Sequence, residues 1–148
     1  MNILVIDSQG GGMGRQLVAA VKSSFPQVTV LAVGTNVMAT TAMLKAGADS
    51  GATGENPVIA ACRKADIIVG PIGIVIADSL LGEVTPAMAA AVGQSNAKRI
   101  LIPVNHCDNI VVGVAELSMG KLVEQAMEQI RQLLSAEAGR ECRSIRKS

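Results

Sequence analysis

A glycine-rich segment near the start of the chain has the residue types of an anion-binding loop. The segment DSQGGGMG, residues 7–14, has glycine at four of five consecutive positions, 10–14. It lies between an apolar run typical of a buried strand, at residues 2–6, and the apolar spacing of a helix that begins near Met13. Glycine lets the backbone approach a ligand closely, and the first amides of a helix are unpaired donors at the positive end of its dipole. The pattern predicts a site for phosphate or another anion, and a tight turn whose glycines serve packing alone is the alternative. The residues that would form the site are Ser8, Gln9, Gly10, Gly11, Gly12, Met13 and Gly14.

Three further segments are expected at the same edge of the fold, because each follows a run typical of a parallel strand. They are GTN at residues 34–36, GPIG at residues 70–73 and the start of NHCDN at residue 105. For Thr35 and Asn36, helix capping or turn formation is the competing role, and for GPIG the alternative is a strand end packed closely on a helix. The additional residues expected in the site are Gly34, Thr35, Asn36, Gly70, Pro71, Gly73 and Asn105.

The class of ligand is narrowed by what these segments lack. Gly11 and Gly14 match the last two glycines of a dinucleotide-binding GxGxxG pattern, but Gln9 stands at the first position. About 20 residues further on, where such proteins hold an acid for the ribose, the chain has GTN at residues 34–36. A Walker-type ATPase motif would need Ser or Thr where Gln16 stands. We therefore expect a phosphate-containing small molecule, with a nucleotide or dinucleotide as the favoured ligand.

Three residues would carry the chemistry if the protein is an enzyme: Asp7, His106 and Cys107. Asp7 could hold Mg²⁺ or a ligand hydroxyl, and hydrogen bonds from the glycine-loop amides are the equal alternative. His106 is the sole histidine, and imidazole titrates close to neutral pH without any perturbation. Cys107 would need a lowered pKa to act as a nucleophile. Neighbours on one loop do not by themselves form a catalytic triad, so catalysis stays open.

Composition excludes several classes of protein. Lys plus Arg number 13 against 12 Asp plus Glu, and this balance favours no nucleic-acid partner. Tyr and Trp are absent, which excludes tyrosine-based acid–base catalysis and aromatic platforms for base stacking. The three cysteines lie far apart without a CxxC pair, so we expect no metal site, no disulfide framework and a cytoplasmic location. The longest charge-free apolar run, residues 67–77, falls short of the ~18–20 residues that a bilayer requires, so no membrane contact is expected.

The elements that must position these residues follow from the apolar pattern. Runs at residues 2–6, 28–34, 66–70, 99–104 and 110–114 predict five strands. Helices are expected between the first four strands and after Ser118, and right-handed crossovers give the strand order 2-1-3-4-5. The last two strands are separated by a stretch too short for a parallel crossover, so strand 5 is expected to be antiparallel. The predicted fold is α/β: a three-layer Rossmann-like sandwich with a mostly parallel five-stranded sheet, whose ligand site lies between strands one and three.

The domain is expected to span residues 1–137. Residues 48–56 are expected to form a loop, of which residues 50–56 are long enough to fold over the binding edge. Residues 138–148 form a basic tail, with three Arg and one Lys against a single Glu. A solvated, frayed terminus is the expectation for this tail, and contact with an anionic partner is the alternative.

Several stretches together resemble a bacterial family of short Rossmann-like proteins, domain of unknown function 3842. They are VIDSQGGGMGRQ (residues 5–16), residues 32–58, residues 66–89 and RILIPVN (residues 99–105). The resemblance implies a Rossmann-like fold with a nucleotide-type site at the first loop, and it implies no reaction. Our interpretation is a single-domain protein that binds a phosphate-containing small molecule and could form a homodimer. A small enzyme acting on that ligand is one alternative, and a non-catalytic oligomeric module with a regulatory or structural role is another.

Overall fold

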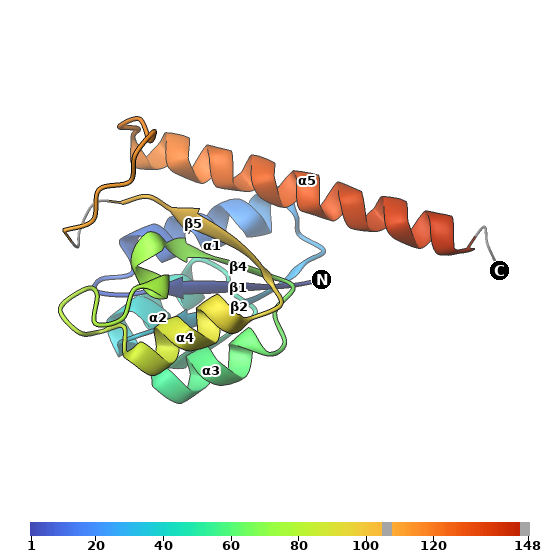
Figure 1. Cartoon of the computed structure of the whole chain (residues 1–148). Helices are drawn as coiled ribbons and strands as arrows, with labels where there is room; N and C mark the ends of the chain where they lie inside the picture. The colour runs from blue at the N-terminus through green and yellow to red at the C-terminus, as the bar shows by residue number, and fades with distance from the viewer. Residues whose placement is uncertain (105–107, 146–148) are drawn as a thin grey trace.

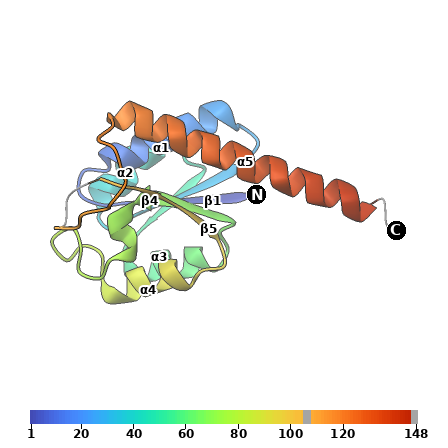
Figure 2. The same cartoon turned by 45° about the horizontal axis from the view of Figure 1, so that its top comes forward.

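Continuous apolar runs build a five-stranded sheet, and helices cover both of its faces in the computed structural model (Figure 1, Figure 2). The structure describes residues 1–104 and 108–145. The strands are β1 (Asn2–Asp7), β2 (Thr29–Gly34), β3 (Ser50–Thr53), β4 (Ile67–Pro71) and β5 (Lys98–Ile102). The helices are α1 (Gly12–Ser24), α2 (Val37–Lys45), α3 (Glu55–Cys62), α4 (Pro86–Gln94) and α5 (Met119–Ile145), and a short 3-10 helix, η1, spans Ile72–Val75.

The sheet has the order β3-β2-β1-β4-β5, and every neighbouring pair of strands is parallel. The chain adds β2 and β3 on one side of β1 and then crosses to add β4 and β5 on the other side. All of β4 and all but the first residue of β1 are buried, as strands covered on both faces must be. β1 and β4 therefore flank the point where the direction of winding reverses, and ligands of such sheets bind at the carboxyl ends of the strands there.

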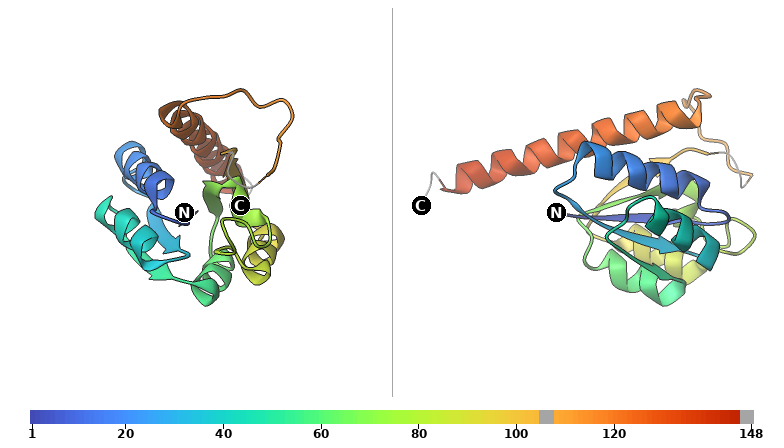
Figure 3. Two further views of the ribbon diagram at one scale, coloured as in Figure 1. Left: turned by 90° about the vertical axis from the view of Figure 1, so that its left-hand side faces the viewer. Right: turned by 180° about the vertical axis from the view of Figure 1, so that it is seen from behind.

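Two apolar cores lie on the two faces of the sheet. One core packs α1, α5 and Met43 of α2 against β1 and β4, and Leu17 and Ile130 are completely buried in it. The other core packs α3, α4 and η1 against the opposite face, with Ile74 and Met88 among its buried side chains. The end-on view in Figure 3 shows helices on both sides of the sheet. Within residues 1–104 and 108–145, no helix combines the length and the apolar character needed to cross a membrane.

Two expectations about the strands were wrong. Residues 110–114 do not form a strand, antiparallel or otherwise, because Gly113 has a φ of +83° and Ile110 and Val112 are almost fully exposed instead of pairing with β5. The fifth strand is β3, within the segment expected to be a loop. Its residues Ser50–Thr53 lack apolar alternation, because an edge strand needs only backbone pairing, here with Leu31–Gly34 of β2. The sheet order is thus 3-2-1-4-5 and wholly parallel.

The last helix is longer than the sequence indicates. α5 continues to Ile145, so residues 138–145 are helical and do not form the frayed terminus that was expected. Its buried positions end at Ile130, with Leu133 and Leu134 partly buried, and residues 135–140 are exposed. Figure 1 shows the C-terminal half of α5 extending beyond the sheet. The core therefore uses only the first part of this helix.

We predict opposite outcomes for two changes in α5. Ile130→Ala should lower the free energy of unfolding by about 2–5 kcal/mol, because it leaves a cavity where a side chain is completely buried. Deletion of residues 138–148 should leave it unchanged, because residues 135–140 are exposed. Urea unfolding followed by circular dichroism measures both changes. A large loss of stability on deletion would show that the end of α5 packs on the domain or on a second subunit.

Candidate functional site

Asp7 anchors the glycine loop to the end of β1. Its side chain is only 6% exposed; Oδ1 accepts a hydrogen bond from the amide of Ser8 (2.8 Å) and Oδ2 accepts one from the amide of Gly14 (2.6 Å). Burial raises the pKa of Asp7, the two amide hydrogen bonds oppose this effect, and the negative charge of Glu83 adds to it. This geometry favours the second role considered for Asp7, in which its carboxylate holds the loop amides.

The four glycines of the loop divide into two pairs. A Cβ on Gly14 would lie 2.6 Å from Met43 Sδ and 2.7 Å from the Cβ of Asp7, and a Cβ on Gly11, at φ +72°, would lie 2.8 Å from the Cα of Ala39. These two glycines permit the close packing of β1, α1 and α2. Gly10 and Gly12 face open space, and their amides have no acceptor within the described part of the chain. Two amide donors of the loop are therefore free to bind a ligand.

A cavity of about 180 Å³ lies against this loop, between the carboxyl ends of β1 and β4. Both α1 and α5 begin at it, since Gly12 and Met119 line its wall. Figure 1 and Figure 3 show the starts of the two helices at the same end of the molecule. The positive ends of two helix dipoles thus face one cavity, and neither Lys nor Arg is among its described lining residues. The full lining is Asp7, Ser8, Gln9, Gly10, Gly11, Gly12, Met13, Pro71, Leu80, Val104 and Met119.

Ser8 has a buried hydroxyl without a partner. The residue is 4% exposed, and it belongs to the cavity wall. Among the side chains that the structure describes, its Oγ is the buried oxygen or nitrogen that makes no hydrogen bond. Buried polar groups are nearly always hydrogen-bonded, so this hydroxyl at the cavity wall is available to bond a molecule that enters the cavity.

Glu83 ties the loop before α4 to the glycine loop. One of its carboxylate oxygens accepts hydrogen bonds from the amide of Gln9 (2.7 Å) and from Thr35 Oγ1 (3.0 Å), and the other accepts one from Asn36 Nδ2 (3.1 Å). Asn36 Nδ2 also donates to the carbonyl of Gln9 (2.8 Å). Gln9 has a φ of +52°, unusual for a residue other than glycine, and these contacts on both sides of it hold that conformation in place.

The other residues predicted for the site have varied roles. Thr35 and Asn36 contact Glu83, and Asn36 also caps α2 through the amide of Ala39. Pro71 lines the cavity. The remaining glycines, Gly34, Gly70 and Gly73, are outside the lining: a Cβ on each would press on Thr40, the carbonyl of Ile6 or Ser79, respectively.

Asn105, His106 and Cys107 lie outside the described residues. The catalytic role considered for His106 and Cys107 therefore stays a proposal. Within residues 1–104 and 108–145, no three His, Cys, Asp or Glu side chains lie close enough together to hold a metal ion.

Four residues at this site were missed by sequence reasoning: Leu80, Glu83, Val104 and Met119. The sequence around Glu83 contains one usable signal, because Glu83 and Asp78 are the only charged residues between Asp66 and Lys98. An isolated acidic residue on a loop at the binding edge is expected to accept hydrogen bonds from a neighbouring loop. The apolar three left no such signal, because their positions depend on how the loop before α4, the end of β5 and the start of α5 pack together.

The wholly parallel sheet and the glycine loop after β1 define a Rossmann-like α/β protein, and the cavity between β1 and β4 lies where ligands of such sheets usually bind. The chain belongs to the family described as Domain of unknown function (DUF3842), which matches residues 2–135. This match confirms the resemblance seen in the sequence. A comparison with curated proteins found no match. Among solved structures, a dodecameric FMN-dependent UbiX-like decarboxylase from Escherichia coli O157:H7 is similar at 18% identity and a TM-score of 0.44, over 87% of this chain and 75% of that one.

We predict that alanine substitutions at two glycines of the loop, Gly14 and Gly12, differ in their effect on the free energy of unfolding.

 Gly14→Ala should lower the free energy of unfolding by about 1–3 kcal/mol, because the new methyl group meets Met43 and Asp7. Gly12→Ala should leave it unchanged or raise it by up to about 1 kcal/mol, because space there is open and alanine restricts the unfolded chain. Equilibrium unfolding in urea measures both. If Gly14→Ala is as stable as the parent protein, the packing around Gly14 is looser than described; an equal loss in Gly12→Ala would show that the space at Gly12 is not open.

We predict a specific pH dependence for the contribution of Asp7 to stability. Because its pKa is raised in the folded protein, that contribution is complete below the unfolded-chain pKa, near 3.8, and is lost as pH rises through the folded-state pKa. The difference in free energy of unfolding between the parent protein and Asp7→Asn should therefore fall with rising pH and then level off. Urea titrations between about pH 3.5 and about pH 7 measure it. A difference that grows with pH would mean that the amide hydrogen bonds outweigh burial.

Proposed function

We propose that this protein binds a phosphate-containing small molecule, with a nucleotide as the favoured class, in the cavity at the glycine loop. The observation that carries the proposal is the unpaired Ser8 hydroxyl in the cavity wall. A phosphate oxygen is the acceptor that this hydroxyl lacks.

The surroundings of Ser8 favour an anion over a neutral ligand. The amides of Gly10 and Gly12 are free donors, and the starts of α1 and α5 place two positive dipole ends at the same cavity. Backbone amides at helix starts bind phosphate without help from Lys or Arg. The proposed contacts therefore come from the loop backbone and from one hydroxyl.

The described part of the site supports binding and supplies no free acid or base. Asp7 is the only residue with an ionisable side chain in the described lining, and both of its carboxylate oxygens accept hydrogen bonds from loop amides. Turnover would have to draw on other groups, for which His106 and Cys107 are our candidates. Loss of turnover in His106→Ala, with ligand binding retained, would support that enzymatic alternative.

The binding proposal is tested by thermal denaturation with inorganic phosphate, pyrophosphate, AMP, ATP, NAD, NADP and FMN. A ligand at 100 times its Kd should stabilise the folded protein by about 2.7 kcal/mol. If none of these compounds raises the Tm, the proposed site does not bind phosphate.

Ser8→Ala separates a binding role of the hydroxyl from a structural one. It should weaken phosphate binding by about tenfold or more, since hydrogen bonds to charged groups contribute about 1.5–3 kcal/mol. It should not lower the free energy of unfolding, because the buried hydroxyl has no partner to lose.

The matched control is Ser95→Ala. The Ser95 hydroxyl donates a hydrogen bond to the carbonyl of Cys62 (2.8 Å), and Ser95 is not part of the cavity wall. This variant should lose about 1 kcal/mol of stability and bind phosphate as the parent protein does. Unchanged phosphate affinity in Ser8→Ala would remove Ser8 from the site.

A further inference from the structure

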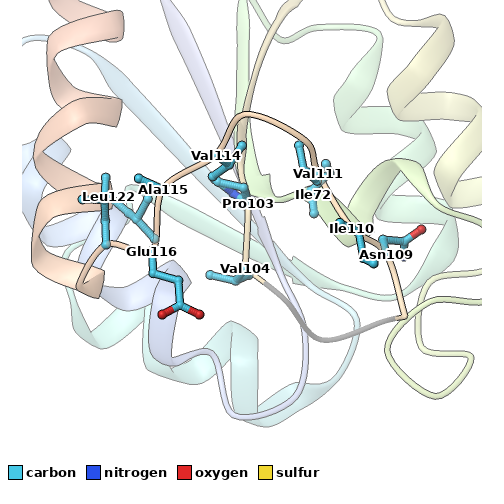
Figure 4. Close-up of a pocket in the computed structure, with 11 residues that line it drawn as sticks. Ile72, Pro103, Val104, Asn109, Ile110, Val111, Val114, Ala115, Glu116 and Leu122 are labelled. Carbon is cyan, nitrogen blue, oxygen red and sulfur yellow. The ribbon is translucent and has the colours of Figure 1, made fainter.

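A second and larger cavity, of about 520 Å³, lies next to the cavity at the glycine loop, which is called the phosphate cavity below. Figure 4 shows the residues that line the larger cavity. Its wall comes from four places in the chain: η1, the residues after β5, segment 109–117 and the first turn of α5. Figure 4 shows mainly hydrocarbon side chains there, with Asn109 and Glu116 as the polar residues. The apolar residues that matter most below are Ile72, Pro103, Val104, Val111, Val114 and Leu122.

The two cavities are neighbours. Val104 lines both of them. In addition, the adjacent residues Pro71 and Ile72 line the phosphate cavity and the larger cavity, respectively. On the first turn of α5, Met119 lines the phosphate cavity and Leu122 lines the larger one. The two cavities therefore adjoin at Val104, which places the larger cavity within reach of a molecule whose phosphate is bound at Ser8.

The volumes of the two cavities favour a ligand that occupies both of them. Ligand sites usually enclose roughly 300–1,000 Å³, so the phosphate cavity, at about 180 Å³, holds only part of a typical ligand. The larger cavity falls within that range. Its wall also leaves apolar surface uncovered: Val111 is 40% exposed and Val114 is 45% exposed. Ligand pockets are typically lined in this way, mainly by apolar side chains with a few polar groups.

We propose that the larger cavity binds the non-phosphate part of the ligand, and that the ligand is a phosphate monoester with a largely apolar body. This inference rests on the proposed function, because it takes the phosphate to be bound at Ser8. The opposite side of the glycine loop has a second hollow, formed by Gln9, Asn36, Val37, Met38 and Glu83. This hollow is shallower and more open to solvent than the larger cavity, so it would cover less of an apolar body.

The experiment uses a series of n-alkyl monophosphates from methyl to hexyl, with inorganic phosphate as the reference. Each compound is titrated into the protein of residues 1–148 and its binding is measured by calorimetry. Each added methylene that enters the cavity should tighten binding by about fourfold. In Val111→Asn the gain for each methylene should fall to less than about half of that factor, because one wall of the cavity becomes polar. Inorganic phosphate should bind to this variant as it does to the parent protein.

Val112→Asn is the matched control. Val112 is the next residue of the same segment, is 92% exposed and is not part of the cavity wall. This variant should keep the full dependence on chain length. Met38→Asn tests the hollow on the opposite side of the loop and should also keep it.

The outcomes separate the two proposals. If inorganic phosphate binds but chain length has no effect, the inference about the apolar body is overturned and the phosphate site stands. If chain length matters equally in the parent protein and Val111→Asn, or is lost in Met38→Asn, the body lies elsewhere and the inference is likewise overturned. If no phosphate compound binds, the proposed function fails, and this inference fails with it.

Discussion

The pair of hydrogen bonds from loop amides to the Asp7 carboxylate is the interaction on which the binding edge depends. Ser8 and Gly14 are six residues apart, and both donate to this one side chain at the end of β1. The carboxylate therefore sets where the loop leaves the sheet and where α1 begins. A buried carboxylate is stable only when its oxygens are hydrogen-bonded, so the loop and the acid each need the other. The amides of Gly10 and Gly12 remain free because other amides satisfy Asp7.

Glu83 extends the same principle to neighbouring segments. Its carboxylate accepts hydrogen bonds from Gln9, Thr35 and Asn36, and it thereby joins the loops that follow β1, β2 and β4. Two acids thus organise a site that we propose for an anion. Their negative charge works against anion binding, and the dipoles of α1 and α5 together with the free amides work in its favour. Because the favourable groups are backbone amides and helix starts, the proposed phosphate would be held by short hydrogen bonds from the backbone.

The sequence was informative where local chemistry decides the structure. Apolar runs predicted β1, β2, β4 and β5 and their relative order, and Asn36 caps α2, as its residue type indicated. The sequence was misleading where pairing with a distant segment decides whether a strand forms. β3 forms from Ser, Gly, Ala and Thr because β2 offers an open edge, while the apolar segment 110–114 borders a cavity instead of joining the sheet.

The candidate site was predictable to a similar degree. The glycine loop could be located from its composition and its position after a strand, and all residues from Ser8 to Met13 line the cavity. The unpaired Ser8 hydroxyl, the contacts of Glu83 and the apolar cavity could not be predicted, because each depends on segments that are distant in the sequence. Glu83 lies 74 residues from the amide that it contacts in the glycine loop.

The shared beginning of α1 and α5 at one cavity has a consequence for synthesis of the chain. Met119, which completes the cavity wall, leaves the ribosome more than 100 residues after the glycine loop. Until α5 docks, Leu17 and Val21 of α1 lack the apolar partners that this helix supplies to their core. The nascent protein can thus form its strands in order, yet it acquires the complete cavity only when α5 has been made.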